Sequence, residues 1–140
     1  MRGHVRIVSM FYASCPYVCP LVFETIKRVE NALATEQRAN LRVTLFTLDP
    51  QRDTAAALKE LARERHVDES RWSLERMDDS AVRKLAGVLG IQYRQLENRD
   101  FNHSSALILL DADGRVLARS SQIGDPDPDF TAAVRNALTR

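Results

Sequence analysis

Residues 5–33 read VRIVSMFYASCPYVCPLVFETIKRVENAL, and this stretch decides the fold. Val5 to Phe11 is short and rich in apolar residues, which predicts a buried strand. The residues that follow have the composition of a loop and include Cys15 and Cys19. From Leu21 onward apolar residues recur at helical spacing. The stretch therefore predicts a strand, a cysteine-bearing loop and a helix, in that order.

The rest of the chain repeats this alternation. Leu41 to Leu48 predicts a second strand, a helix follows through Leu58 and Leu61, and Trp72 with Leu74 indicates a short extended piece. The remaining predicted elements are a helix capped within 78–80 that stops at Gly90, a strand Ala106 to Leu110, its hairpin partner Val116 to Arg119, and a last helix with Asp127 as N-cap and Pro128 first. Alternating strands and helices imply a parallel core, and the late hairpin adds an antiparallel edge. This order predicts an α/β, thioredoxin-like fold with a central mixed sheet flanked by helices.

Composition narrows the class of protein. The 140 residues suit one domain spanning 1–140 and are enough for a hydrophobic core. Lysine and arginine number 20 against 19 acids, so the formal net charge of +1 gives no electrostatic reason for nucleic acid as a partner. The sequence contains no apolar run long enough to cross a membrane.

The two cysteines, Cys15 and Cys19, are the only ones in the chain and lie four positions apart between the predicted strand and helix. A helix N-terminus favours thiolate over thiol, so both sulfurs are expected to be reactive. Two thiolates select soft or borderline ions such as Cu(I) or Zn(II), and two thiolates with one added imidazole suit copper better than structural zinc. The alternative is a buried or disulfide-bonded pair without a metal.

Three histidines compete to supply the imidazole. His103 lies directly before the apolar strand Ala106 to Leu110, in what the sequence predicts to be a loop. In a thioredoxin-like fold this loop faces the start of the cysteine-bearing helix, which makes His103 the candidate third ligand. His4 and His66 are expected to be structural or incidental. Met10 and Met77 carry thioethers that could bind Cu(I), but a methionine within a strand more often fills the core.

Three motifs together resemble the Sco/SenC family of copper proteins, which assist assembly of cytochrome c oxidase. Residues 15–20, CPYVCP, look like the family's C-P-x-V-C-P copper motif. Residues 49–54, DPQRDT, are similar to its D-P-x-R-D-T segment, and His103 with Ser104 falls where the family has its ligand histidine and following serine. Tyr17 and Asn102 depart from the pattern, because the family commonly has aspartates there.

The resemblance implies a function beyond the residues themselves. It implies that Cys15, Cys19 and His103 bind copper as Cu(I) or Cu(II). It also implies delivery of copper to, or reduction of the cysteines of, the binuclear copper centre of cytochrome c oxidase. The partners would be the copper-bearing oxidase subunit or another copper chaperone, on the periplasmic side of the bacterial inner membrane. The family's N-terminal anchor and first strands are expected to be absent from these residues.

Asp49 and Asp53 are open to two interpretations. They could contact the metal loop or a partner. Alternatively, Asp49 could end a strand while Asp53 caps or charges the start of the following helix, for which residues 53–54 supply the capping side chains, with Arg52 paired to one of the aspartates.

Two other classes of function use the same cysteines. One is a thiol–disulfide oxidoreductase or thiol peroxidase, with Cys15 and Cys19 as attacking and resolving thiols and His103 as a nearby base. The three residues between the cysteines count against a standard thioredoxin, whose redox loop has two. The other class is a partner-binding module with a vestigial site, which would have no affinity for copper.

Overall fold

The computed structural model describes residues 3–12, 18–95, 101–103 and 106–139, and within these ranges all side chains except those of 18–20, 93–95 and 101–103. Its elements, in chain order, are β1 Val5–Phe11, α1 Val18–Asn31, α2 Thr35–Ala39, β2 Leu41–Thr47, α3 Ala55–Glu64, β3 Trp72–Glu75, α4 Asp79–Leu89, β4 Tyr93–Gln95, β5 Phe101–His103, β6 Leu107–Leu110, β7 Val116–Ser120 and α5 Pro128–Leu138. Every strand and helix that the sequence predicted is present. The structure adds α2 and the β4–β5 hairpin.

A mixed five-stranded sheet in the order β3-β2-β1-β6-β7 forms the centre of the fold. β1 pairs in parallel with β2, and β2 in parallel with β3. β6 runs antiparallel to β1, and β7 antiparallel to β6. The predicted parallel core with an antiparallel edge is therefore confirmed. The short hairpin of β4 and β5 forms a second sheet.

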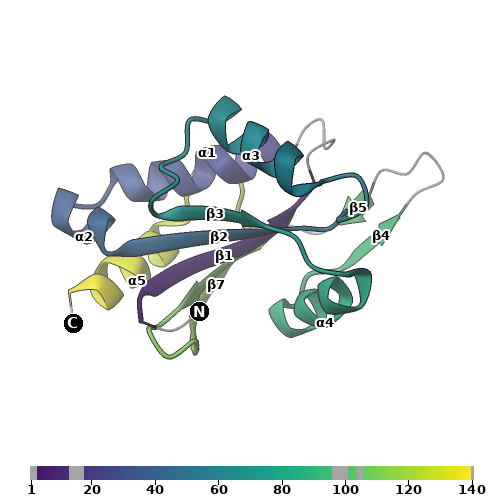
Figure 1. Cartoon of the computed structure of the whole chain (residues 1–140). Helices are drawn as coiled ribbons and strands as arrows, with labels where there is room; N and C mark the ends of the chain where they lie inside the picture. Colours follow the sequence, from purple (N-terminus) through teal and green to yellow (C-terminus); the bar gives the residue numbers. More distant parts are fainter. Residues whose placement is uncertain (1–2, 13–17, 96–100, 104–105, 140) are drawn as a thin grey trace.

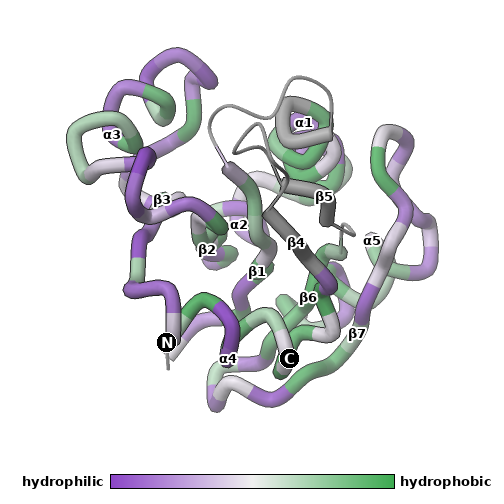
Figure 2. Tube along the Cα trace, turned by 90° about the vertical axis from the view of Figure 1, so that its right-hand side faces the viewer, coloured by the Kyte–Doolittle hydropathy of each residue, from purple (hydrophilic) through white to green (hydrophobic). Residues whose placement is uncertain are grey.

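Helices cover both faces of this sheet. Figures 1 and 2 show α1 and α3 on one face and α4 on the other. α5 packs beside β7, and its Arg135 donates a hydrogen bond to the Ala32 carbonyl just beyond α1, at 3.1 Å. The core lies between these layers, with Ile7, Val43 and Leu45 of the central strands fully buried. No helix in the described part of the chain is long and apolar enough to span a bilayer.

Local sequence explains where the helices begin and end. Thr54 caps α3 by accepting a hydrogen bond from the Ala57 amide, and Asp78 caps α4 in the same way. Asp127 caps α5 and Pro128 opens it, as predicted. Gly90 ends α4 in the left-handed conformation with φ of 73°, which glycine adopts without steric cost.

A buried polar cluster, the Glu30 cluster, fastens the amino-terminal end of the parallel strands. The Glu30 carboxylate, whose side chain is 7% exposed, accepts from Arg71 at 2.5 Å and from the Trp72 indole at 3.1 Å. Asp68 accepts from the Ser70 hydroxyl and amide and from Arg71, and these bonds hold the pKa of Asp68 below its usual range. Burial lowers the pKa of Arg71, but the bonds and charges of Glu30 and Asp68 outweigh it and raise that pKa.

Candidate metal centre

The candidate site lies at the C-terminal ends of β1 and β2, which we call the carboxyl edge of the sheet. Because these strands are parallel and β6 is antiparallel to β1, their last residues and the start of β6 lie along one edge of the sheet. The Leu48 amide donates to the Phe11 carbonyl at 2.6 Å, and the Ser9 hydroxyl donates to the Ala106 carbonyl at 2.6 Å. The helices α1 and α3 also start at this edge, on the right in Figure 1. Chain segments far apart in sequence therefore meet here.

Cys19 belongs to the first turn of α1, as its second residue. This position places its backbone among the unpaired amides at the positive end of the helix dipole, an environment that stabilises a thiolate. Cys15 lies outside the described residues, and the side chain of Cys19 is also outside the description. Their joint role as metal ligands stays a prediction.

His103 lies in a strand, which corrects the prediction of a loop. It is the last residue of β5 and pairs with Tyr93 of β4 in an antiparallel hairpin. Only two residues separate it from Ala106 in the sequence, so the Cα atoms of His103 and Ala106 lie at most about 10 Å apart. Because Ala106 accepts from Ser9 of β1, the His103 backbone lies near the edge where α1 begins. The position of its imidazole is outside the description, so its role as a ligand also stays a prediction.

The turn between β2 and α3 is described in full and forms a second buried network, the turn cluster. Its members are Thr47, Asp49, Arg52 and Asp53. The Thr47 hydroxyl donates to the Asp53 carboxylate at 2.5 Å and accepts from the Asp49 amide at 3.0 Å. Arg52 donates from Nε to the Asp49 carboxylate. Asp49 and Asp53 are 4% and 3% exposed, so both carboxylates are held inside the protein.

These contacts settle the two interpretations of the aspartates in part. Asp49 ends the strand region and pairs with Arg52, as one interpretation expected. The capping side chain predicted within residues 53–54 is that of Thr54. Asp53 comes one residue before this cap, and its carboxylate accepts from Thr47. The role of Thr47 was not predicted. Its only signal was a hydroxyl at the end of a β-branched strand, six residues before a carboxylate.

The other candidates lie away from the candidate ligands or in the core. Met10 is 2% exposed within β1 and fills the core, as expected. Met77 is half-buried and packs against the core. His66 follows the C-terminal end of α3, at the far end of that helix from the site, with φ of 54°. Among the described side chains, no group of three or more His, Cys, Asp or Glu residues could hold a metal ion.

The three predicted ligands form a donor set that fits copper. Thiolate sulfur and imidazole nitrogen are both ligands of copper, and no hard oxygen donor is required. The Asp49 and Asp53 carboxylates accept from Arg52 and Thr47, and neither residue belongs to the predicted donor set.

Comparisons with known proteins agree with this architecture. The family model described as SCO1/SenC matches residues 1–139. An SCO2-like protein of Rickettsia typhi is 26% identical over 122 residues, covering 84% of this chain and 59% of its own length. The chain thus spans less than two thirds of the curated relatives that it matches first.

Two solved structures share the fold. A SCO1/SenC family lipoprotein from Bacillus anthracis superposes with a TM-score of 0.86 at 21% identity, covering 99% of this chain and 83% of that one. ScoI of Bradyrhizobium japonicum, solved with copper bound, gives a TM-score of 0.75 at 19% identity, covering 99% of this chain and 85% of that one.

The fold and the start of α1 define a thioredoxin-like protein with a mixed sheet, in which Cys19 belongs to the first turn of a helix that begins at the carboxyl ends of the parallel strands. Since the family model matches nearly the whole chain, the chain belongs to the SCO1/SenC family.

Proposed function

We propose that this protein binds one copper ion through Cys15, Cys19 and His103. The observation that carries the proposal is the shared end of the sheet, where α1 begins and where Ala106, just before β6, accepts from Ser9 of β1. Thiolates at a helix start and an imidazole from across the edge would supply two soft ligands and one nitrogen ligand. The copper-bound ScoI relative supports the same chemistry.

The biological role that we propose is a metallochaperone for cytochrome c oxidase. The protein would deliver copper to the binuclear copper centre, or reduce the cysteines of that centre, on the copper-bearing oxidase subunit. Another copper chaperone would be its source of metal. We place this activity on the periplasmic side of the bacterial inner membrane, a location that the lipoprotein relative supports.

A titration of reduced protein with Cu(I), and separately with Cu(II), under anaerobic conditions tests the site. We expect one equivalent of copper and a thiolate-to-Cu(II) charge-transfer band. Cys15→Ala or Cys19→Ala should abolish the band. His103→Ala should weaken Cu(II) binding much more than Cu(I) binding, because two thiolates can hold Cu(I) alone.

His4→Ala and His66→Ala are matched controls and should leave both titrations unchanged. If either cysteine variant keeps the wild-type spectrum and affinity, the ligand assignment is wrong. If His103→Ala behaves like the wild type while the cysteine pair still cycles between dithiol and disulfide, the thiol–disulfide oxidoreductase becomes the better assignment.

A further inference from the structure

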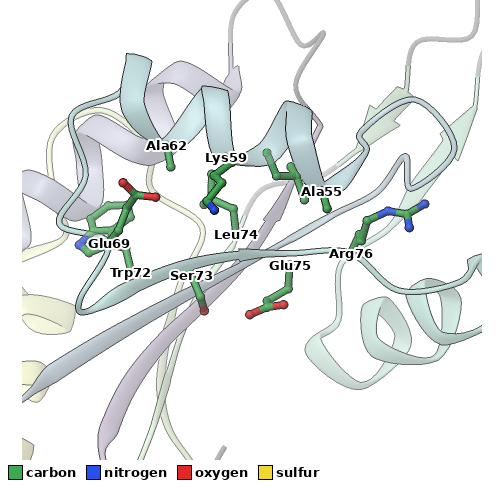
Figure 3. Close-up of a pocket in the computed structure, with 10 residues that line it drawn as sticks. Ala55, Lys59, Ala62, Glu69, Trp72, Ser73, Leu74, Glu75 and Arg76 are labelled. Atoms are coloured by element: carbon green, nitrogen blue, oxygen red, sulfur yellow. The ribbon is translucent and has the colours of Figure 1, made fainter.

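A pocket of about 360 Å³ opens between α3 and β3, far along the sheet from β7. Figure 3 shows that Trp72 and Leu74 point from β3 toward α3, while Ser73 and Glu75 point to the other side of the strand. Leu58, Ala62 and Trp72 make a buried apolar floor. A side chain entering the pocket would therefore meet hydrocarbon.

Within the described residues, the strand beside this pocket has backbone hydrogen-bonding groups without a partner. β3 is an edge strand of the five-stranded sheet. The Val43 amide donates to the Arg71 carbonyl at 3.0 Å, and alternation along a parallel ladder then directs the amide and carbonyl of Leu74 away from β2. Trp72 likewise turns its carbonyl outward, while its amide bonds to the Asp68 carbonyl. An extended chain could pair with Leu74 and Trp72 along this edge.

Charge along the edge favours a basic ligand. A second pocket of about 390 Å³ continues from the first, because Arg76 lines both. Together the two pockets are lined by four carboxylates, Glu69, Glu75, Asp78 and Asp79, and by two cations, Lys59 and Arg76. Arg76 already donates to the Pro50 carbonyl at 2.5 Å, whereas Glu69 and Glu75 have no hydrogen bond or ion pair within the described part of the chain. A charge interaction does join Glu75 to Arg6: burial lowers the pKa of Arg6, and the charge of Glu75 opposes that lowering.

The position of α3 favours a single extended segment over a second folded copy of this protein as the occupant of the β3 edge. Figure 2 shows α3 above β3 at the edge of the sheet. If two copies paired through β3 about a twofold axis normal to the sheet, their α3 helices would lie on the same face, one on each side of the new strand pair, and would have to pack against each other. An added strand needs only about 5 Å beside β3, so a single extended segment fits beneath α3.

We propose that the β3 edge binds an extended, basic segment of a partner polypeptide by strand addition. One aliphatic side chain of this segment occupies the α3–β3 pocket, and its backbone pairs with Leu74. The lysine or arginine side chains that flank this aliphatic side chain point to the opposite face of the strand and lie beside Glu75. The groove ends at Pro50 and Gln51, next to the turn cluster, so the bound segment leads toward the carboxyl edge of the sheet. The proposal is independent of copper, since no candidate ligand lines either pocket.

The test uses the ¹⁵N-labelled full chain and the blocked peptide Ac-Lys-Val-Lys-Val-Lys-NH₂. We expect saturable chemical-shift changes centred on residues 72–76 and slower hydrogen exchange of the Leu74 amide. Two control peptides should bind at least fivefold more weakly: Ac-Glu-Val-Glu-Val-Glu-NH₂ has the opposite charge, and Ac-Lys-Pro-Lys-Pro-Lys-NH₂ lacks the central backbone donors. Equal binding of either control would overturn strand addition by a basic segment.

Variants of the protein locate the contact. Leu74→Pro removes the outward amide at an edge position where proline is tolerated, and it should weaken binding roughly fivefold or more. Glu75→Lys should weaken binding about two- to fivefold, whereas Glu60→Lys, the same charge change on the exposed side of α3, should not. If Leu74→Pro fails to fold, the comparison of Glu75→Lys with Glu60→Lys tests the proposal by itself. Wild-type binding by Glu75→Lys, or concentration-dependent protection of Leu74 without peptide, would refute the proposal.

Discussion

The Glu30 cluster and the turn cluster are both built on buried carboxylates, but they hold the fold together in different ways. The Glu30 cluster joins residues 41 and 42 positions apart and so ties α1 to β3. The turn cluster joins residues at most six positions apart, and each bond shapes one short connection. One network therefore secures the packing of distant elements, while the other fixes the local backbone beside the candidate metal centre. The difference predicts that stability and copper binding will respond separately to mutation.

Glu30→Ala should give the largest loss of stability. It leaves the Arg71 guanidinium and the Trp72 indole without their buried acceptor, and breaking a buried ion pair costs about 3–5 kcal/mol. Urea denaturation measures this loss, with exposed Glu24→Ala on the same helix as control. The copper stoichiometry of the folded fraction should not change. A loss of stability below about 1 kcal/mol would show that the Glu30 cluster does not hold α1 to β3.

Thr47→Val should give a smaller loss of stability, about 2 kcal/mol, together with weaker copper binding. The substitution keeps the side-chain shape but removes the donor to Asp53 and the acceptor for the Asp49 amide, both of which are buried. Thr44→Val, on the same strand and also buried, is the matched control for copper affinity. If both variants bind copper equally well, the turn cluster does not position the site.

Gly90→Ala tests a region that belongs to neither cluster. Its φ of 73° disfavours a side chain, and an added Cβ would lie 2.6 Å from the guanidinium of Arg119. We expect a loss of about 1–2 kcal/mol without any change in copper affinity. Gly87→Ala, where a Cβ meets nothing within 4 Å, should instead stabilise α4 by about 0.5–1 kcal/mol. Calorimetric melting of the two variants measures both effects, and equal melting temperatures would contradict the assignment of Gly90.

Asp68→Asn should have the smallest effect, and one that depends on pH. The pKa of Asp68 is lowered in the folded state, so its contribution is present above the unfolded pKa of about 3.9 and is lost as pH falls through the folded value. Wild type and variant should therefore differ most near neutral pH and converge as the pH falls through the lowered pKa of folded Asp68. Urea midpoints at neutral pH and in the acid range measure the difference. A gap between the two proteins that widens in acid would reverse the sign and exclude this role.

Periodicity and capping residues were sufficient to predict most of the fold. The apolar run of β1 and the spacing of Val22, Ile26 and Val29 on α1 reflect only which side chains are buried. A buried strand or helix face appears directly in the sequence as a pattern of apolar residues. α2 was missed because none of its five residues is buried. The β4–β5 hairpin was missed because each strand has only three residues, too few for an alternating pattern.

The candidate site could be predicted only as a set of residue types at one edge of the sheet. Strand order brings Cys19 and His103 toward the same edge, and this part follows from the alternation of strands and helices. The role of Asp53 could not be predicted in the same way. Its partner Thr47 lies across a turn, and both a helix cap and a buried acceptor were compatible with the sequence around it.

The order of the strands in the sheet also determines when β1 can gain its two neighbours during translation. β1 is the central strand, yet one of its two neighbours, β6, leaves the ribosome about 100 residues later. At roughly 5–20 residues per second, the nascent chain holds a hydrophobic strand with one open side for about 5–20 s. β2 and β3 can join during this interval, but the β6 side stays open to aggregation. Slowing translation between residues 11 and 107 should therefore raise the demand for chaperones more than slowing it after residue 110.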